Sequence, residues 1–284
     1  MKGKPIDIHT HLRTSESIKA MGPFFEYMEA YFRSPKLGEI TIEQALRDFE
    51  EAGVGKFVLL PLDYSRVTGM PGDTNDFMAE VQRVDPDRII AFATVDPLAG
   101  RRAVVELERA VKDLGLRGLK LHPQVQRFRP DDERCFEVYQ AAEDLGIPIL
   151  FHTGHTGFGA GMEGGGGVKL DYGRPIYIDN VAAEFRRLKL IMAHFGWPWY
   201  EEALSIALHK ANVYIDLSGW APRYIPQIVW RYADTLLQDK ILFGSDYPLI
   251  RPARWLSEFE KIDLKPETRE KILWANAERV LGIK

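Results

Sequence analysis

The chain contains a single cysteine among its 284 residues, so it cannot form an intrachain disulfide. A lone thiol, Cys135, is typical of a protein from a reducing compartment. The sequence has no block rich in lysine or arginine, and its formal net charge is −4, so it offers little attraction to a nucleic-acid backbone. No apolar run approaches the roughly 18 residues that would span a bilayer. These absences argue against a disulfide-stapled, nucleic-acid-binding or membrane-spanning protein.

The first residues, Met-Lys-Gly-Lys-Pro, lack the apolar stretch of a signal peptide and run directly into a strand-like segment. Hydrophobic residues make up 45% of the chain, which is enough for a large buried core. We therefore expect a soluble, cytoplasmic protein with no membrane partner. Residues 12–37 form an aromatic-rich segment longer than an ordinary loop, and this segment is the reason to expect a homodimer contact or a cover over a site.

Eight short apolar runs recur along the chain, and a helix-length segment separates each run from the next. Apolar runs without alternation are typical of parallel strands covered by helices. No Gly-x-Gly-x-x-Gly follows the first run, which argues against a dinucleotide-binding sheet. We therefore predict an α/β fold in which residues 1–284 form one (β/α)8 TIM barrel. The predicted strands are Pro5–His9, Lys56–Pro61, Arg88–Val95, Gly118–His122, Ile147–His152, Leu188–His194, Val213–Ser218 and Lys240–Gly244.

Three of the intervening helices have clear boundary signals. Thr41 precedes a helical pattern that runs to about Ala52, where a glycine follows. Apolar residues between Asp132 and Leu145 recur at helical spacing, and Gly146 ends that pattern. Pro266 begins the last predicted helix, in keeping with the preference of proline for the first helical turn.

Histidines concentrate where the predicted strands end. In a barrel of this kind the carboxyl ends of the strands meet at one rim, where active sites are built. Asp246 lies just beyond the eighth strand, and imidazoles with a carboxylate suit a borderline metal such as zinc. The alternative is a set of hydrogen-bonded core histidines with an aspartate that caps a turn. The histidines at strand ends are His9, His11, His122, His152 and His194, five of the seven in the chain.

These motifs resemble those of the amidohydrolase superfamily, and most closely its amidohydrolase-2 branch, which includes lactone hydrolases and metal-dependent decarboxylases. The resemblance extends from residue 5 to residue 282. It is carried by the sequences Asp7-Ile8-His9-Thr10-His11, Gly118-Leu119-Lys120-Leu121-His122-Pro123, Phe151-His152-Thr153-Gly154, Ala193-His194-Phe195-Gly196, Phe243-Gly244-Ser245-Asp246-Tyr247-Pro248 and Asn276-Ala277-Glu278-Arg279-Val280-Leu281-Gly282.

The resemblance implies that His9, His11, His152 and Asp246 hold a divalent metal, and that His194 is a further ligand or lies beside them. Zinc is the expected ion, with manganese as the alternative. Two-metal members of the superfamily carboxylate a strand-4 lysine that bridges the ions. Single-metal sites are usual in the branch that this chain resembles, so one ion is favoured over two.

Other polar residues are candidates for substrate contact. Lys120 and His122 share one phase of the fourth strand, and an uncarboxylated Lys120 would contact substrate or an acid. Arg13 continues the alternation of His9 and His11 and could hold a substrate carboxylate. Arg251 is a second anion-binding candidate, and His155 could reach the site from its loop. For either arginine, a surface salt bridge is the alternative.

The residues suit more than one reaction on a small-molecule substrate. We expect a hydrolase that acts on a small lactone, amide or carboxylate through a metal-activated water, with Asp246, His194 and Lys120 as catalytic residues. The alternative is a non-oxidative decarboxylase of a small aromatic acid. His-Thr-His-Leu-Arg is also similar to the opening of cyclic-amide hydrolases, which is a second alternative. A barrel that binds a ligand without catalysis is the last.

Overall fold

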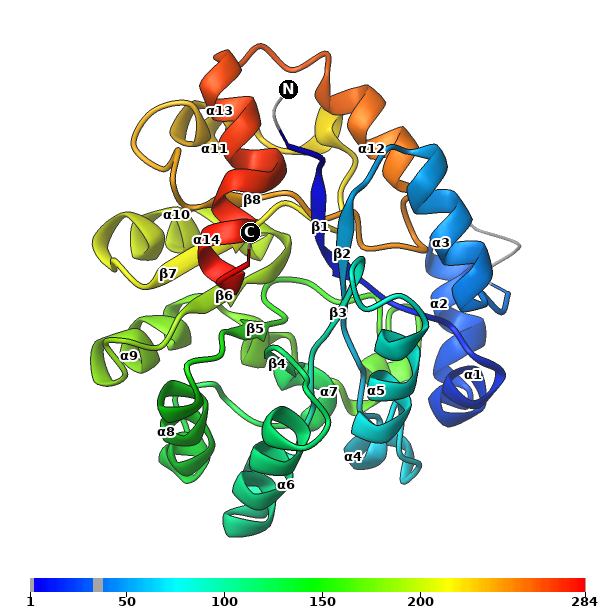
Figure 1. Ribbon diagram of the computed structural model, residues 1–284. Coiled ribbons are helices and arrows are strands. Elements are labelled where there is room, and N and C mark those ends of the chain that lie inside the picture. The colour runs from blue at the N-terminus through cyan, green and yellow to red at the C-terminus, as the bar shows by residue number, and fades with distance from the viewer. Residues whose placement is uncertain (1–2, 33–37, 284) are drawn as a thin grey trace.

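The structure is a computed structural model that describes residues 3–32 and 38–283. Strands and helices alternate along the chain, so that the strands surround a central axis and the helices lie outside them (Figure 1). Each of the eight predicted strands is confirmed, because an observed strand overlaps every predicted range. The strands are β1 Ile6–Thr10, β2 Lys56–Leu59, β3 Ile89–Ala91, β4 Leu119–Leu121, β5 Ile149–Phe151, β6 Leu190–Met192, β7 Val213–Asp216 and β8 Ile241–Leu242.

Two parallel ladders, β1–β2–β3 and β4–β5–β6–β7–β8, make up the strand layer. Backbone hydrogen bonds join them at both edges. At one edge Lys120 N donates to Ala93 O at 2.8 Å, and at the other Ile8 N donates to Phe243 O at 3.0 Å. The eight strands therefore form a ring, and the fold is the predicted TIM barrel.

The helices cover the ring from outside, and a π-helical turn at Lys271–Ala275 joins the penultimate helix to the last one. No helix in the described parts of the chain has both the length and the apolar character that a membrane span needs. The helices are α1 Ser15–Met21, α2 Phe24–Phe32, α3 Ile42–Glu51, α4 Ser65–Thr68, α5 Asn75–Val84, α6 Arg101–Lys112, α7 Pro123–Gln126, α8 Phe136–Leu145, α9 Ile176–Glu184, α10 Tyr200–His209, α11 Gln227–Ala233, α12 Pro252–Phe259, α13 Pro266–Glu270 and α14 Asn276–Leu281.

The predicted helix boundaries are confirmed where the sequence carries capping residues. Thr41 is the N-cap of α3 and its hydroxyl accepts a hydrogen bond from the backbone N–H of Gln44. Gly146 ends α8 with a left-handed φ of 69°, a conformation that a residue without a side chain adopts at low cost. Pro266 begins α13.

The aromatic-rich segment forms α1 and α2, while residues 33–37 of it lie outside the described residues. Together with two loops, these helices form a small apolar cluster separate from the barrel core. Within it, Phe24 of α2 stacks on Phe158 at a ring-centroid distance of 4.3 Å, and Tyr64 stacks on the same ring at 5.4 Å. The cluster therefore fixes α2 against the loop that follows β5.

A buried asparagine ties α14 to β8. The Nδ2 atom of Asn276 donates to Ile241 O and Gln238 O, both at 2.8 Å, and its side chain has no exposure. We expect Asn276→Ala to lower the free energy of unfolding by about 3 kcal/mol, because two carbonyls lose a buried donor. Urea or thermal unfolding measures this change. The matched control is Asn180→Ala, whose bond to Asp131 is exposed. Equal stability of both variants would contradict the assignment.

Candidate metal centre

Two histidines at the end of β1, His9 within the strand and His11 one residue beyond it, each direct one ring nitrogen toward the same place. The Nδ1 atom of His11 lies 2.8 Å from the carbonyl oxygen of Leu60, and only a protonated nitrogen can donate to that acceptor. The Nδ1 atom of His9 lies 2.9 Å from Oδ2 of Asp216. The proton therefore lies on Nδ1 in both rings, and the Nε2 lone pair of each remains able to bind a cation.

Asp246 completes a group of three ligand-type atoms. Its Oδ1 lies 3.7 Å from Nε2 of His9 and 3.6 Å from Nε2 of His11. All three atoms lie within 4.8 Å of one another. At these separations they can surround a divalent cation at ligand distances of about 2.0–2.2 Å. Asp246 has a φ of 63°, which is uncommon for a residue other than glycine and is typical of functional sites.

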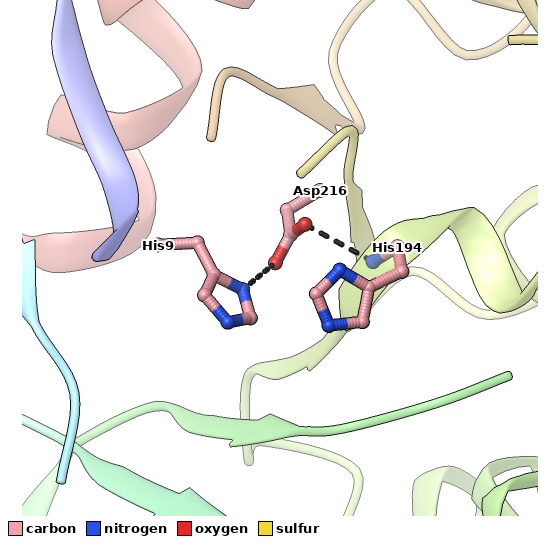
Figure 2. Close-up of side chains that lie close together, drawn as sticks. All are labelled: His9, His194 and Asp216. Atoms are coloured by element: carbon pink, nitrogen blue, oxygen red, sulfur yellow. Dashed lines mark hydrogen bonds and ion pairs between the residues drawn. The ribbon is translucent and has the colours of Figure 1, made fainter. Parts of the chain in front are cut away.

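Asp216 of β7 forms hydrogen bonds with two of the histidines (Figure 2). Its Oδ2 accepts a hydrogen bond from Nδ1 of His9, and its Oδ1 accepts one from the backbone N–H of His194 at 3.1 Å. Ser218 Oγ lies 3.0 Å from Nδ1 of His9 and 2.9 Å from Nδ1 of His194. Atoms of His9, His194 and Asp216 also lie within 4.8 Å of one another. They are engaged in these hydrogen bonds, so Asp216 is a positioning residue rather than a preferred cation ligand.

His152 and His194 form a second pair beside the first group. The Nε2 atom of His194 lies 3.2 Å from Nδ1 of His152, which is within hydrogen-bond distance. The ring centroid of His194 lies 4.7 Å from that of His9. Among the described residues, two groups of three ligand atoms that lie within 4.8 Å of one another contain His9, and neither group contains His152. The structure thus brings all five expected ligands to one rim and separates them into a group of three and an adjacent pair.

Lys120 and His122 face the same centre, as their shared strand phase predicts. The Nζ atom of Lys120 lies 3.3 Å from Nε2 of His9. Burial lowers the pKa of Lys120 to about 8, although Asp216 and Asp246 act in the opposite direction. The ring of His122 stacks on that of His152 at a centroid distance of 3.8 Å. A buried amine and a further imidazole therefore adjoin the group of three.

Burial sets the protonation of these side chains. It is the largest cause that lowers the pKa of His9, His122 and His152 well below the usual value, and it lowers the pKa of His11 to about 3. Burial also raises the pKa of Asp246. Near neutral pH these imidazoles are uncharged, which is the form that binds metals.

A pocket of about 110 Å³ opens onto the centre. For comparison, an apolar cavity of about 150 Å³ holds a benzene molecule, so the space has the size of one ring. Its ionisable side chains lie together at the centre, and apolar side chains provide the remaining wall. The apolar wall consists of Leu12, Met21, Met28, Phe32, Leu62, Tyr64, Val125, Phe158 and Leu249.

Of the expected substrate-binding residues, Arg13 and His122 line this pocket, and Arg251 and His155 do not. The side chain of Arg251 is 71% exposed and lies 3.8 Å from Asp48, so the salt-bridge alternative replaces the expected substrate contact. His155 lies beneath α2, with its Nε2 3.1 Å from the hydroxyl of Tyr31. Its carbonyl oxygen accepts a hydrogen bond from Nε2 of His152, so its contribution to the site is through its backbone.

The sequence did not indicate three features of the centre. Asp216 belongs to none of the motifs that indicated the site, and in the structure its partner is His9. Ser218, two residues later, belongs to the same network. The alternation of polar residues at the end of the β7 segment was the available signal. The Leu60 carbonyl that orients His11 had no signal in the sequence, because any residue supplies a carbonyl.

The profile of the amidohydrolase family matches residues 6–283, from the start of β1 to the end of α14. The chain belongs to the amidohydrolase family. The resemblance inferred from the strand-end motifs is thereby confirmed.

This amidohydrolase is similar to two decarboxylases over most of its length. It is 22% identical to the gamma-resorcylate decarboxylase of a Polaromonas species, with 100% of this chain and 99% of that enzyme covered. It is 24% identical to the decarboxylase OrsB of Emericella nidulans, with 74% of this chain and 75% of that enzyme covered.

A solved structure agrees with the barrel. The uncharacterized TIM-barrel protein Bb4693 of Bordetella bronchiseptica is 25% identical to this amidohydrolase and superposes with a TM-score of 0.80 over 98% of each chain. The full-length superposition means that the strand ends which carry the histidines belong to the conserved barrel architecture and not to an added domain.

The Asp216–His9 hydrogen bond generates a prediction about metal affinity. Asp216→Asn preserves the shape of the side chain but removes the negative charge beside the Nδ1–H of His9. We expect the zinc affinity of the amidohydrolase to fall by roughly 10–100-fold, measured by competition with a chromophoric chelator. Asp239→Asn, at a carboxylate that is 60% exposed and pairs with Lys271, is the matched control. Unchanged zinc affinity in the Asp216 variant would show that this carboxylate does not orient a ligand.

The buried amine of Lys120 generates a prediction about pH. Burial lowers its pKa from 10.5 to about 8, so between these pH values the unfolded chain binds a proton that the folded chain does not. Lys120 therefore destabilises the metal-free protein increasingly as pH falls through this window. The stability of Lys120→Met relative to wild type should rise by up to about 3 kcal/mol from pH 10.5 to pH 8. Urea unfolding at several pH values measures the difference, and a difference independent of pH would contradict the burial argument.

Proposed function

We propose that this amidohydrolase is a metal-dependent enzyme that decarboxylates a small aromatic carboxylic acid without oxidation. The similarity to gamma-resorcylate decarboxylase over the full length of both chains carries the choice of reaction. The similarity to a second decarboxylase supports it. The ring-sized pocket, apolar on one side and ionisable on the other, suits an aromatic ring with an acid group.

The donor set fits a divalent cation. Three ligand atoms converge: Nε2 of His9, Nε2 of His11 and one oxygen of Asp246. The amine of Lys120 lies close to Nε2 of His9. We propose that these three residues hold one ion, with His152 and His194 beside it. Zinc suits the imidazoles, and manganese is the alternative because it suits carboxylate ligands. When bound, the ion supplies a Lewis acid that binds and polarises oxygen atoms of the substrate.

The protein's own residues supply the proton that the reaction needs. As the bond between ring carbon and carboxylate breaks, its electron pair stays on the ring carbon and takes up one proton, and carbon dioxide leaves. We assign this proton to Asp246, the carboxyl group that lines the pocket. Oδ1 of Asp246 faces the imidazoles, so the proton lies on Oδ2. A water molecule then returns a proton to Asp246 and leaves hydroxide, which balances the negative charge that the substrate carboxylate lost as it became carbon dioxide.

The surroundings of Asp246 keep room for this transfer. Gly219 has a φ of 76°, and a Cβ atom there would lie 2.7 Å from Nδ1 of His194 and 3.4 Å from Oδ2 of Asp246. A glycine at this position therefore leaves space next to both side chains. We assign Lys120 and His194 to holding the substrate's oxygen atoms, since both line the pocket beside Asp246.

Hydrolysis was the expectation from the sequence, and the two relatives favour the decarboxylase alternative instead. A water molecule could be activated by the same rim residues to open a lactone or an amide. The products therefore distinguish the two reactions, since one releases carbon dioxide and the other a new acid group. The cyclic-amide reading and the purely ligand-binding reading have no supporting observation in the site.

The decisive experiment incubates the metal-loaded protein with 2,6-dihydroxybenzoate and a panel of other hydroxybenzoates. We expect release of carbon dioxide, and in D2O one deuterium at the ring carbon that lost the carboxylate. Chelation should abolish activity, and zinc or manganese should restore it. Acid release from lactones with no carbon dioxide from any benzoate would overturn the decarboxylase proposal.

The same preparation tests the number of ions. We expect one ion per chain by elemental analysis and an unmodified Lys120 by mass spectrometry. Two ions per chain together with a carboxylated Lys120 would contradict the single-metal part of the proposal and leave the reaction to be judged by its products.

A further inference from the structure

Arg13 is a buried cation beside the proposed substrate site. It follows β1 two residues after His11, and its side chain is only 6% exposed and lines the pocket. Its main chain is fixed, because its carbonyl oxygen accepts a hydrogen bond from the backbone N–H of Ile40 at 2.8 Å. The guanidinium is therefore part of the pocket wall in the folded protein.

No side chain of residues 3–32 or 38–283 makes an ion pair or a hydrogen bond with this guanidinium. The more exposed Arg66 and Arg109, by contrast, each pair bidentately with an aspartate. A largely buried guanidinium that has no partner among the described residues is costly, so a ligand in the pocket is the natural source of an anion.

The charged side chains that line the pocket favour a ligand with more than one negative charge. Arg13 and Lys120 are the cationic side chains that line it, and Asp246 is the anionic one. A divalent ion at the proposed site would add two positive charges. A ligand with a single carboxylate would leave most of this positive charge without a counter-charge.

The carboxylate that leaves is a poor partner for Arg13. It loses its charge as it becomes carbon dioxide, so a guanidinium bound to it would stabilise the starting acid more than the transition state. Such an interaction would slow the reaction. An acid group that keeps its charge throughout could bind Arg13 bidentately at no such cost, because the interaction is equal before and after bond cleavage.

We propose that the substrate is an aromatic acid with a second carboxylate that remains on the product, and that Arg13 is the residue that selects for it. This inference rests on the proposed decarboxylase function. It adds the substrate class, a single-ring dicarboxylic acid, and assigns Arg13 to specificity and not to catalysis.

A matched set of ligands tests the selection. The set consists of 2,6-dihydroxybenzoate, its derivative with a second carboxylate at ring position 4, and the derivative with a neutral carboxamide at that position. With wild-type protein we expect the diacid to have a kcat/KM roughly 100-fold above that of the carboxamide, because a site built to pair a charge rejects the uncharged analogue.

Arg13→Met removes the charge, Arg13→Lys retains it without the fork, and Arg251→Met is the control at an exposed arginine outside the pocket. We expect Arg13→Met to raise KM for the diacid by roughly 50-fold and to change the carboxamide reaction by less than about threefold. Arg13→Lys should be intermediate, and Arg251→Met should equal wild type. Equal loss on both ligands, or no preference of wild type for the diacid, would overturn the assignment.

Binding of 3,5-dihydroxybenzoate, the product that retains the second carboxylate, separates this inference from the proposed function. Calorimetry measures its binding without any turnover. Tighter binding to wild type than to Arg13→Met, by roughly 50-fold, supports Arg13 as the anion site even if no benzoate releases carbon dioxide. Equal binding to both proteins contradicts the inference even if decarboxylation is observed.

Discussion

The site depends on two buried hydrogen bonds that fix the protons of His9 and His11. Asp216 accepts the proton of one ring and the Leu60 carbonyl accepts that of the other. With Nδ1 occupied in both rings, each Nε2 presents a lone pair toward Asp246. Were either acceptor absent, that ring could turn or exchange its tautomer, and the three ligand atoms would no longer converge. The barrel contributes by fixing β1, β2 and β7 relative to one another, since the Leu60 carbonyl follows β2 on one side of β1 and Asp216 comes from β7 on the other side, beyond β8.

Much of the fold could be predicted because its signals are local. All eight strands follow from apolar runs, and Thr41, Gly146 and Pro266 mark helix boundaries by capping chemistry. The strand-end position of the histidines follows from the same pattern, because parallel strands place their carboxyl ends at one rim. The proximity of His9, His11 and Asp246 was therefore predictable from residues more than 200 positions apart in the chain.

The remaining features depend on contacts that no local pattern records. His194 and Asp246 adopt left-handed φ values of 57° and 63°, and these turns decide where their side chains point. The separation of His152 from the group of three follows from such geometry. The sequence left open whether Arg251 binds substrate or forms a surface salt bridge, and its exposed guanidinium lies 3.8 Å from Asp48. The apolar wall is built from four loops and from α1, α2 and α7, so its size is a property of packing and not of any motif.

The proposed catalytic centre requires a divalent cation among His9, His11 and Asp246. Anomalous diffraction from crystals grown with zinc or manganese tests this most directly. We expect one strong anomalous peak at ligand distance from Nε2 of both histidines and from an Asp246 oxygen. Nδ1 of His9 should still be hydrogen-bonded to Asp216. A well-ordered site with no peak there, or with the ion bound elsewhere on the rim, would contradict it.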